Sequence, residues 1–226
     1  GLFFLLFRID SNNPPMKRIL YLFLLIPVLS FSQQKQPSAA VIEQRLQKLN
    51  FLGSAMMVAA HPDDENTLLI TWLANDRLAT TAYFAMTRGD GGQNLIGPEI
   101  RDELGLIRTQ ELLAARKIDG GQQFFTRAND FGFSKVASET FEIWDKDAIL
   151  SDVVRVIRQF KPDVVINRFP PTERAGHGHH QGSAILSIEA FSNSGSPKSF
   201  HSILGRFTPY KFDKFISLTV LFIFEL

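Results

Sequence analysis

Apolar runs of strand length alternate with segments of helical periodicity along this chain. Ser54 to Ala60 contains an unbroken apolar run between Gly53 and Pro62, which is typical of a strand buried on both faces of a sheet. Asp64 to Asp76 then repeats apolar residues at helical spacing, and Leu78 to Met86 indicates a second strand. Because helices that alternate with strands cover a mainly parallel sheet on both faces, the sequence predicts an α/β fold with ligands beyond the carboxyl ends of the strands.

The alternation continues through the rest of the body. Phe124-Phe125 indicates a short third strand, and Asp163 to Asn167 indicates another buried one. Helices are expected over three further segments, Glu99 to Lys117, Asp145 to Phe160 and Gln181 to Phe191. The apolar positions expected to face the core in the first two are Leu104, Ile107, Leu112, Ala115, Ile149, Val153, Val156 and Ile157. Gly120-Gly121 is expected to end the first of these helices.

Composition narrows the chemistry of any site. The 24 Lys and Arg residues nearly balance the 23 Asp and Glu residues, so no large positive field attracts nucleic acid or anionic lipid. The chain has no cysteine, which excludes disulfides, thiolate metal sites and a cysteine nucleophile, so any metal must be bound by His and carboxylates. Since the chain has 21 phenylalanines, Phe131, Phe133 and Phe169 are predicted to pack in the core or at its lip.

The two ends are expected to lie outside the main domain. Met16 opens a Met-Lys-Arg start that is followed by an apolar run from Ile19 to Leu29 and a polar exit at Ser32, the layout of a signal peptide. That run is shorter than the roughly 20 residues of a spanning helix. We therefore expect export to the periplasm or the extracellular space, with no stable membrane anchor after cleavage.

The chain is accordingly divided into five segments. Residues 1–15 are expected to lie upstream of the native protein, 16–32 to form the signal peptide, 33–52 to form a lead-in, 53–191 to form the main domain, and 192–226 to form an anomalous or truncated tail. A second complete domain is not expected from this length.

Four ionisable side chains follow the first buried strand in the run His61-Pro62-Asp63-Asp64-Glu65. His61 and Asp64 are three residues apart, so that a tight turn can direct both at one ion, while Asp63 between them can face a water. The competing interpretation is helix capping, for which acidic residues are favoured in the first turn without any metal.

A second cluster, Gly176-His177-Gly178-His179-His180, is expected in a loop after the strand 163–167 and holds three of the five histidines. A surface loop with incidental histidines is the alternative. Because the carboxyl ends of parallel strands meet at one edge, we expect the two clusters to form one site. Imidazole and carboxylate ligands with one position left for water are typical of catalytic zinc sites, so the pattern favours a metal-dependent hydrolase.

The run from Ala60 to Glu65 resembles the signature of PIG-L, or LmbE-like, deacetylases, whose second motif is His-Pro-Asp-His; here His177 to His180 stands in its place. The resemblance covers about Gly53 to Phe191 and includes the glycine loop Thr87 to Gly91. It implies a Rossmann-like sheet and a zinc-dependent deacetylase that acts on an N-acetylglucosamine-type sugar or glycoconjugate.

The resemblance also implies a role for each matching residue. It implies that His61, Asp64 and His180 bind one zinc ion, or another divalent metal, and that Asp63 is the general base. It further implies that His177 assists the reaction, by stabilising an oxyanion if it is protonated.

Arg108 and Asp130 would bind the sugar by the same resemblance. Two departures stand beside it: Gly178-His179 replaces the usual Pro-Asp, and Ala175 lies where some members carry a tyrosine. A non-catalytic carbohydrate-binding relative, and a zinc hydrolase that acts on another amide or ester, therefore stay open. The natural substrate, the oligomeric state and the group that protonates the leaving amine are not specified by the sequence.

Overall fold

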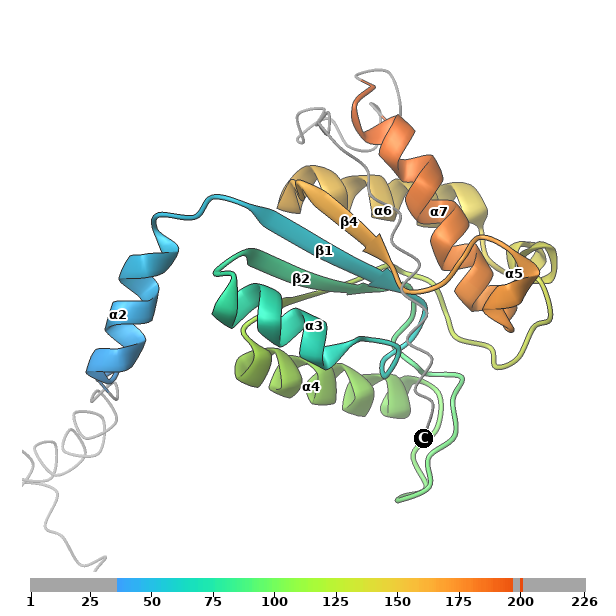
Figure 1. Cartoon of the computed structure of the whole chain (residues 1–226). Helices are drawn as coiled ribbons and strands as arrows, with labels where there is room; N and C mark the ends of the chain where they lie inside the picture. The colour runs from blue at the N-terminus through green and yellow to red at the C-terminus, as the bar shows by residue number, and fades with distance from the viewer. Residues whose placement is uncertain (1–35, 197–199, 201–226) are drawn as a thin grey trace, which may run out of the picture. The chain divides into compact units, whose positions relative to one another are not determined.

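The structure is a computed structural model, and it describes residues 36–196 and Phe200 (Figure 1). The segments 1–15 and 16–32, the start of the lead-in and most of the tail therefore lie outside the described residues. The chain divides into two compact units, Gly1–Glu43 and Gln44–Leu226. Within the described part of the chain, no helix has the length and apolar character needed to cross a membrane.

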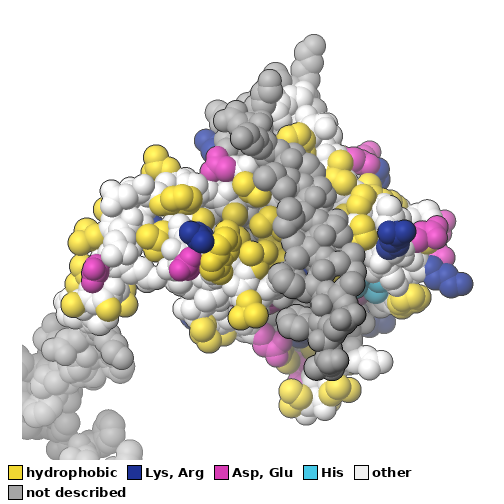
Figure 2. Space-filling view, in the orientation of Figure 1, with side chains coloured by type: hydrophobic (Ala, Val, Ile, Leu, Met, Phe, Trp, Pro, Cys, Tyr) yellow, Lys and Arg dark blue, Asp and Glu magenta, His cyan; other side chains and the backbone are white. Residues whose placement is uncertain are grey.

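Helix α2 (Ala39–Lys48) spans the boundary between the two units. It has no buried residue, and its apolar side chains Val41, Ile42 and Leu46 are 38% to 59% exposed. Hydrophobic side chains are accordingly visible over its surface in the space-filling view (Figure 2). The core described below contains no residue of this helix.

Four parallel strands form one sheet in the order β3-β2-β1-β4. They are β1 (Ser54–Ala59), β2 (Thr80–Ala85), β3 (Gln122–Phe125) and β4 (Val164–Asn167). Each begins and ends within two residues of its prediction. The α/β class with a parallel sheet is confirmed.

Helices cover both faces of this sheet (Figure 1). One face carries α3 (Thr67–Thr71), which continues as the π-helical turn η1 (Trp72–Asp76), and α4 (Asp102–Asp119). The other face carries α6 (Lys146–Phe160) and α7 (Gly178–Ser194), and α5 (Ala137–Ile143) packs against α7. The short 3-10 turn η2 (Glu173–Ala175) precedes α7. Neither α5 nor η2 was predicted, since seven and three residues are too few to show a helical period.

Three helix starts differ from their predictions by three residues, and one of them is that of α4, which begins at Asp102 rather than Glu99. The helix predicted from Asp64 is α3, and it begins at Thr67 because the side chain of Asn66 accepts a hydrogen bond from the Leu69 N–H at 3.0 Å and caps the helix there. The last begins at Gly178 rather than Gln181, with His177 as its N-cap. His179 and His180 therefore lie in the first turn of a helix and not in a loop.

Among the core positions predicted on the helices, one is wrong, and Phe133, which was predicted to pack in the core or at its lip, is 69% exposed. Ile107 is 37% exposed, because the buried residues of α4 extend from Leu104 around the helix through Leu112 to Arg116. Leu104 lies at the margin of this buried face, and Ile107 lies beyond that margin. Ile149, Val153, Val156 and Ile157 on α6 are buried as predicted.

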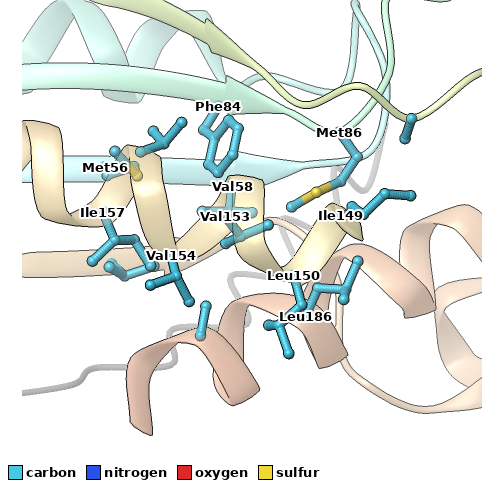
Figure 3. Packing of buried hydrophobic residues seen from close by; sticks show 14 of the residues in the cluster. Met56, Val58, Phe84, Met86, Ile149, Leu150, Val153, Val154, Ile157 and Leu186 are labelled. Carbon is cyan, nitrogen blue, oxygen red and sulfur yellow. The ribbon is translucent and has the colours of Figure 1, made fainter. Parts of the chain in front are cut away.

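Alternate residues of the strands build two cores. On one face, Met56 and Val58 of β1 pack with Phe84 of β2 against α6 and α7 (Figure 3). On the other face, Met57 and Tyr83 join a smaller cluster with side chains from α3 and α4. Because helices cover the sheet on both faces, successive residues of β1 are buried on alternate sides, and its sequence is a continuous apolar run.

The strand order locates the crevice of the sheet. The chain moves from β1 outward through β2 to β3 and then returns to place β4 on the opposite side of β1. The direction of winding therefore reverses between β1 and β4. In open parallel sheets, ligands bind at such a switch point, outside the carboxyl ends of the two strands.

We predict that Ile157→Ala lowers the free energy of unfolding by roughly 2–5 kcal/mol, because it leaves a cavity in the larger core, where Ile157 is 1% exposed. Ile118→Ala is the matched control, since Ile118 also lies on a helix but is 85% exposed, and its change is expected to stay within about 0.5 kcal/mol. Urea unfolding followed by circular dichroism measures both. Equal effects would contradict this assignment of the core.

Candidate active site

Both motif clusters lie at the switch point. His61 follows the end of β1 by two residues, and His177 to His180 form the N-cap and first turn of α7, after β4. Since β1 and β4 are paired in parallel from Ala55 with Val164 to Val58 with Asn167, their carboxyl ends are adjacent. Two segments more than 110 residues apart in sequence are thereby brought together.

Three side chains converge here as a candidate metal triad, His61, Asp64 and His180. Their ligand atoms lie within 4.8 Å of one another. Asp64 Oδ2 is 3.3 Å from His61 Nδ1, and Asp64 Oδ1 is 3.4 Å from His180 Nε2. Asp64 does not cap α3, because Asn66 does so; its Oδ2 instead accepts a hydrogen bond from the His61 N–H at 2.7 Å.

His180 is oriented on both sides of its ring. Its Nδ1 lies 3.1 Å from the carbonyl oxygen of Ala175, and since a carbonyl can only accept, Nδ1 carries the proton and the Nε2 lone pair faces Asp64. Phe169 stacks on the ring with a centroid distance of 3.8 Å and an interplanar angle of 2°. Sequence reasoning assigned Phe169 to packing and missed this contact, because nothing in the sequence links the two rings.

The donor set fits a divalent metal. Two imidazoles and one carboxylate, with the ring of His180 oriented through its second nitrogen, form the three-ligand pattern that leaves a position for water or substrate. The bond from His180 reaches the backbone of Ala175, so it does not depend on which side chain stands at that position.

The loop that carries the first motif is held by its carbonyl oxygens. Three side chains from three different segments donate to three of them: Tyr83 Oη to His61 O, Arg108 Nη2 to Pro62 O at 2.9 Å, and Arg168 Nε to Asp64 O at 3.0 Å. Tyr83 is fully buried, and this burial raises its pKa well above the usual value. The loop is therefore fixed from β2, α4 and the end of β4.

Asp63 stands apart from the triad. Its backbone has a φ of 90°, a strained region for a residue with a side chain, and such strain is common at functional sites. The side chain is 70% exposed, and its Oδ2 accepts a hydrogen bond from Arg108 Nη2 at 2.9 Å. This contact with Arg108 was not expected from the sequence.

The residues predicted for catalysis and substrate binding surround one cavity of about 310 Å³. His61, Asp63, Arg108, Asp130 and His177 line it together with the glycine loop. Gly91 of that loop is packed so tightly that a Cβ would lie 2.3 Å from the carbonyl oxygen of Asp130. Only glycine therefore allows the loop to form this wall beside Asp130.

The charges of the triad favour its ionised carboxylate. Burial would lower the pKa of His61, but its hydrogen bond to Asp64 and the charges of Asp64 and Asp130 outweigh burial and raise it. Burial would raise the pKa of Asp64, and the bond and charge of His61, with the charge of His180, lower it. Burial, opposed in part by Asp64, lowers the pKa of His180.

His177 faces the cavity as a neutral ring. Burial, and then the charges of His61 and His180, lower its pKa to about 4. Its Nδ1 accepts a hydrogen bond from the His179 N–H at 3.0 Å, so the ring proton lies on Nε2. These surroundings disfavour the protonated form of His177, and a neutral ring still offers one N–H donor.

His179 received no role from the sequence. Its ring is fully buried, and its Nδ1 lies 2.9 Å from His61 Nε2 and 3.7 Å from Asp130 Oδ1. Burial, and then the charges of His61, His177 and His180, lower its pKa to about 2.

The glycine before His179 has a packing reason. A Cβ at Gly178 would lie 2.4 to 2.5 Å from Ser134 Oγ, Thr140 Oγ1 and the Val136 carbonyl oxygen. The Gly178 N–H also donates to the carbonyl oxygen of Ser134 at 2.8 Å, a bond that proline could not make. The departure from Pro at this position therefore matches the way α7 begins against α5.

Comparison with known proteins identifies one family. The model of PIG-L, described as GlcNAc-PI de-N-acetylase, matches residues 56–191, more than half of the chain and including both motifs. No curated protein matches the chain by sequence.

Solved structures share the fold. An N,N'-diacetylchitobiose deacetylase from Pyrococcus horikoshii has a TM-score of 0.55 at 18% identity, over 79% of this chain and 68% of that one. A conserved protein of Thermus thermophilus has a TM-score of 0.50 at 20% identity, over 73% and 64%. A 4-carboxy-2-hydroxymuconate hydratase from Pseudomonas putida has a TM-score of 0.48 at 17% identity, over 66% and 59%. The chain thus spans 59% to 68% of these proteins' lengths. At identities this low, the first two structures support the fold alone.

We predict that His180→Ala loses stoichiometric zinc, because it removes one of three ligand atoms of the triad. His177→Ala is the matched control and is expected to keep zinc, since its Nδ1 is already used at the start of α7. Elemental analysis of both purified variants, after dialysis, measures the bound metal. Loss of zinc from the control with retention in His180→Ala would place the metal elsewhere in the cluster.

Proposed function

Because the chain belongs to the PIG-L (GlcNAc-PI de-N-acetylase) family of deacetylases, we propose that it is a zinc-dependent hydrolase that removes the acetyl group from an N-acetylglucosamine-type sugar or glycoconjugate. The observation that carries the proposal is the triad His61, Asp64 and His180, of which His61 lines a cavity together with Asp63 and His177. A metal site, a carboxylate and an N–H donor are the parts that hydrolysis of an amide requires.

In this proposal the triad holds one divalent ion, which when bound would polarise the acetamide carbonyl and lower the pKa of water toward about 7. Asp63 accepts the proton of the attacking water. Its position suits this role, since its side chain is 70% exposed at the cavity while Arg108 holds one of its oxygens at 2.9 Å and leaves the other oxygen to face water. Arg108 thus orients the base.

His177 serves as the oxyanion donor. The Nε2–H of its neutral ring donates a hydrogen bond to the carbonyl oxygen as negative charge develops there. A neutral imidazole is a weak acid, so the leaving amine takes its proton from Asp63, which holds the proton it received from water. The proton is returned in the same turnover, and the products are acetate and a free amine.

Asp130 and Arg108 are the residues that we propose for sugar recognition. Both line the cavity of about 310 Å³, and Asp130 also lines a neighbouring cavity of about 520 Å³ beyond the glycine loop. A carboxylate accepts from sugar hydroxyls and a guanidinium donates to them, so the pair can select a polyol ring. The choice of an N-acetylglucosamine-type substrate is based on the description of the family, GlcNAc-PI de-N-acetylase.

We also propose that the protein acts outside the cytoplasm. The support is the sequence of residues 16–32, with its basic start and its short apolar run. Fusion of residues 1–32 to a reporter enzyme that is active only after export provides a direct test. A reporter that stays inactive would remove this part of the proposal.

The proposed activity predicts acetate release from N-acetylglucosamine compounds that stops when a chelator removes the metal and returns with added zinc. An enzyme-coupled acetate assay on the full chain, with and without chelator, measures it. Metal-dependent cleavage of other amides or esters, without acetate release from the sugars, would favour a zinc hydrolase on another bond. Zinc binding with no turnover on any amide or ester would favour a carbohydrate-binding relative.

We predict that Asp63→Asn keeps zinc and lowers kcat by roughly 10²- to 10⁴-fold, because an amide cannot accept the proton of water. Glu111→Gln is the matched control: it removes another carboxylate that contacts Arg108, at 3.2 Å, from a side chain that is 58% exposed and outside the cavity lining. Its kcat is expected to stay near the native value. An Asp63→Asn protein with native zinc-dependent turnover would exclude Asp63 as the base.

A further inference from the structure

We propose that His179 is a positioning residue that fixes the tautomer of the metal ligand His61 by accepting its Nε2 proton. The inference rests on the proposed metal site, and it assigns a role to a residue for which the sequence provides none. It is carried by the contact between His61 Nε2 and His179 Nδ1 at 2.9 Å.

The two nitrogens of His61 face different neighbours. Nδ1 lies 3.3 Å from Asp64 Oδ2 and thus belongs to the triad, whereas Nε2 points away from it toward His179. A neutral imidazole that offers its Nδ1 lone pair as a ligand must carry its proton on Nε2. Asp130 Oδ2 is 3.9 Å from Nε2, which is too long for a hydrogen bond, so His179 Nδ1 is the acceptor in place.

The ring of His179 is held in one orientation. It is fully buried, stacks on Trp144 with a centroid distance of 4.7 Å and meets the edge of Phe131 at 4.3 Å. Trp144 is itself anchored, because its Nε1–H donates to the carbonyl oxygen of Asn129 at 2.8 Å. The acceptor atom is therefore placed by packing before any metal binds, as outer partners of metal ligands commonly are.

The proposed role also explains a buried polar atom of the His179 ring. If His179 Nδ1 accepts, its own proton must lie on Nε2, and among the residues that the structure describes this atom has no hydrogen-bond partner. A buried polar atom without a partner is uncommon and calls for an explanation. Here the explanation is that the other nitrogen is required as the acceptor for His61.

The local charges favour an imidazole over a carboxylate at this position. His179 Nδ1 lies 3.7 Å from Asp130 Oδ1, and the Asp130 side chain is only 6% exposed. A carboxylate in the place of His179 would put a second buried negative charge beside Asp130, whereas a neutral ring accepts the same hydrogen bond without that repulsion. The replacement of Pro-Asp by Gly178-His179 is thus consistent with an intact metal site.

A second interpretation of the same atoms is that His61, His177 and His179 themselves bind an ion, since their ligand atoms also lie within 4.8 Å of one another. The two interpretations differ in what His179 contributes. As an acceptor it changes the affinity of one ion, and as a ligand it adds a second ion.

Three substitutions separate these cases. His179→Leu removes the acceptor and keeps an apolar side chain in the slot beside Trp144. His179→Asn keeps an acceptor, because its amide oxygen reaches the place of imidazole Nδ1, whereas His179→Gln carries its amide to the place of Nε2, away from His61. Zinc affinity of the full chain is measured by competition with a chromophoric chelator, and far-UV circular dichroism checks that each variant is folded.

We expect His179→Leu and His179→Gln to raise the zinc Kd by roughly 10- to 100-fold, the usual effect of losing an outer partner of a metal ligand, and His179→Asn to restore most of the affinity. Native affinity in a folded His179→Leu would overturn the proposal. If His179→Leu does not fold, equal affinities of the Asn and Gln variants overturn it. Two zinc ions in the native chain and one in His179→Leu would show that His179 is a ligand, which also overturns it.

Nitrogen NMR provides a direct readout. Two-bond ¹H–¹⁵N spectra of the zinc-loaded chain are expected to show His61 with its proton on Nε2, and a proton on Nδ1 would contradict the inference. Neither measurement uses turnover. A chain that shows the expected zinc affinities but releases no acetate would therefore reject the proposed activity and leave the role of His179 standing.

Discussion

Parallel pairing of β1 with β4 is the constraint on which the rest of the site depends. The pairing of Ala55 with Val164 through Val58 with Asn167 brings the two carboxyl ends to one edge, and the order of the strands makes that edge a switch point. The covered faces of the sheet supply the cohesion, with one apolar cluster on each side. Since the apolar packing is on the two faces, the carboxyl edge of the sheet can carry ionisable side chains. Fold and site are therefore consequences of one arrangement of strands.

Polar side chains then give the edge its rigidity. A loop that bends sharply enough to turn Asp64 back toward His61 cannot satisfy its own carbonyl oxygens, and Tyr83, Arg108 and Arg168 donate to three of them. The strained backbone of Asp63 persists within this framework. Buried neighbours complete the site, since Phe169 and the Ala175 carbonyl orient His180 from its two sides. Of the residues that hold the loop, Arg108 also lines the cavity.

Much of the fold and part of the site could be predicted from the chain itself. Apolar runs located β1, β2 and β4, the pair Phe124-Phe125 indicated β3, and both motifs were expected after buried strands, where the structure has them. Helix starts were less predictable: Asp64 and Asn66 are both good caps, and only the orientation of the Asp64 side chain, which accepts from His61, leaves capping to Asn66. The three histidines of the second motif were expected in a loop, whereas His179 and His180 lie in the first turn of α7. Nothing local indicated that His177 could cap a helix.

Local sequence by itself determined which residue types carry the chemistry. One imidazole and a carboxylate three residues apart, a second histidine cluster, and no cysteine restrict any metal to His and carboxylate ligands. Only the tertiary structure decided the role of each. Arg108 contacts Asp63, Phe169 stacks on His180, and the buried His179 meets the far nitrogen of His61. The physical reason is that orientation, burial and proton position depend on partners from distant segments, which are brought within a few ångströms only when the sheet forms and α7 packs on it.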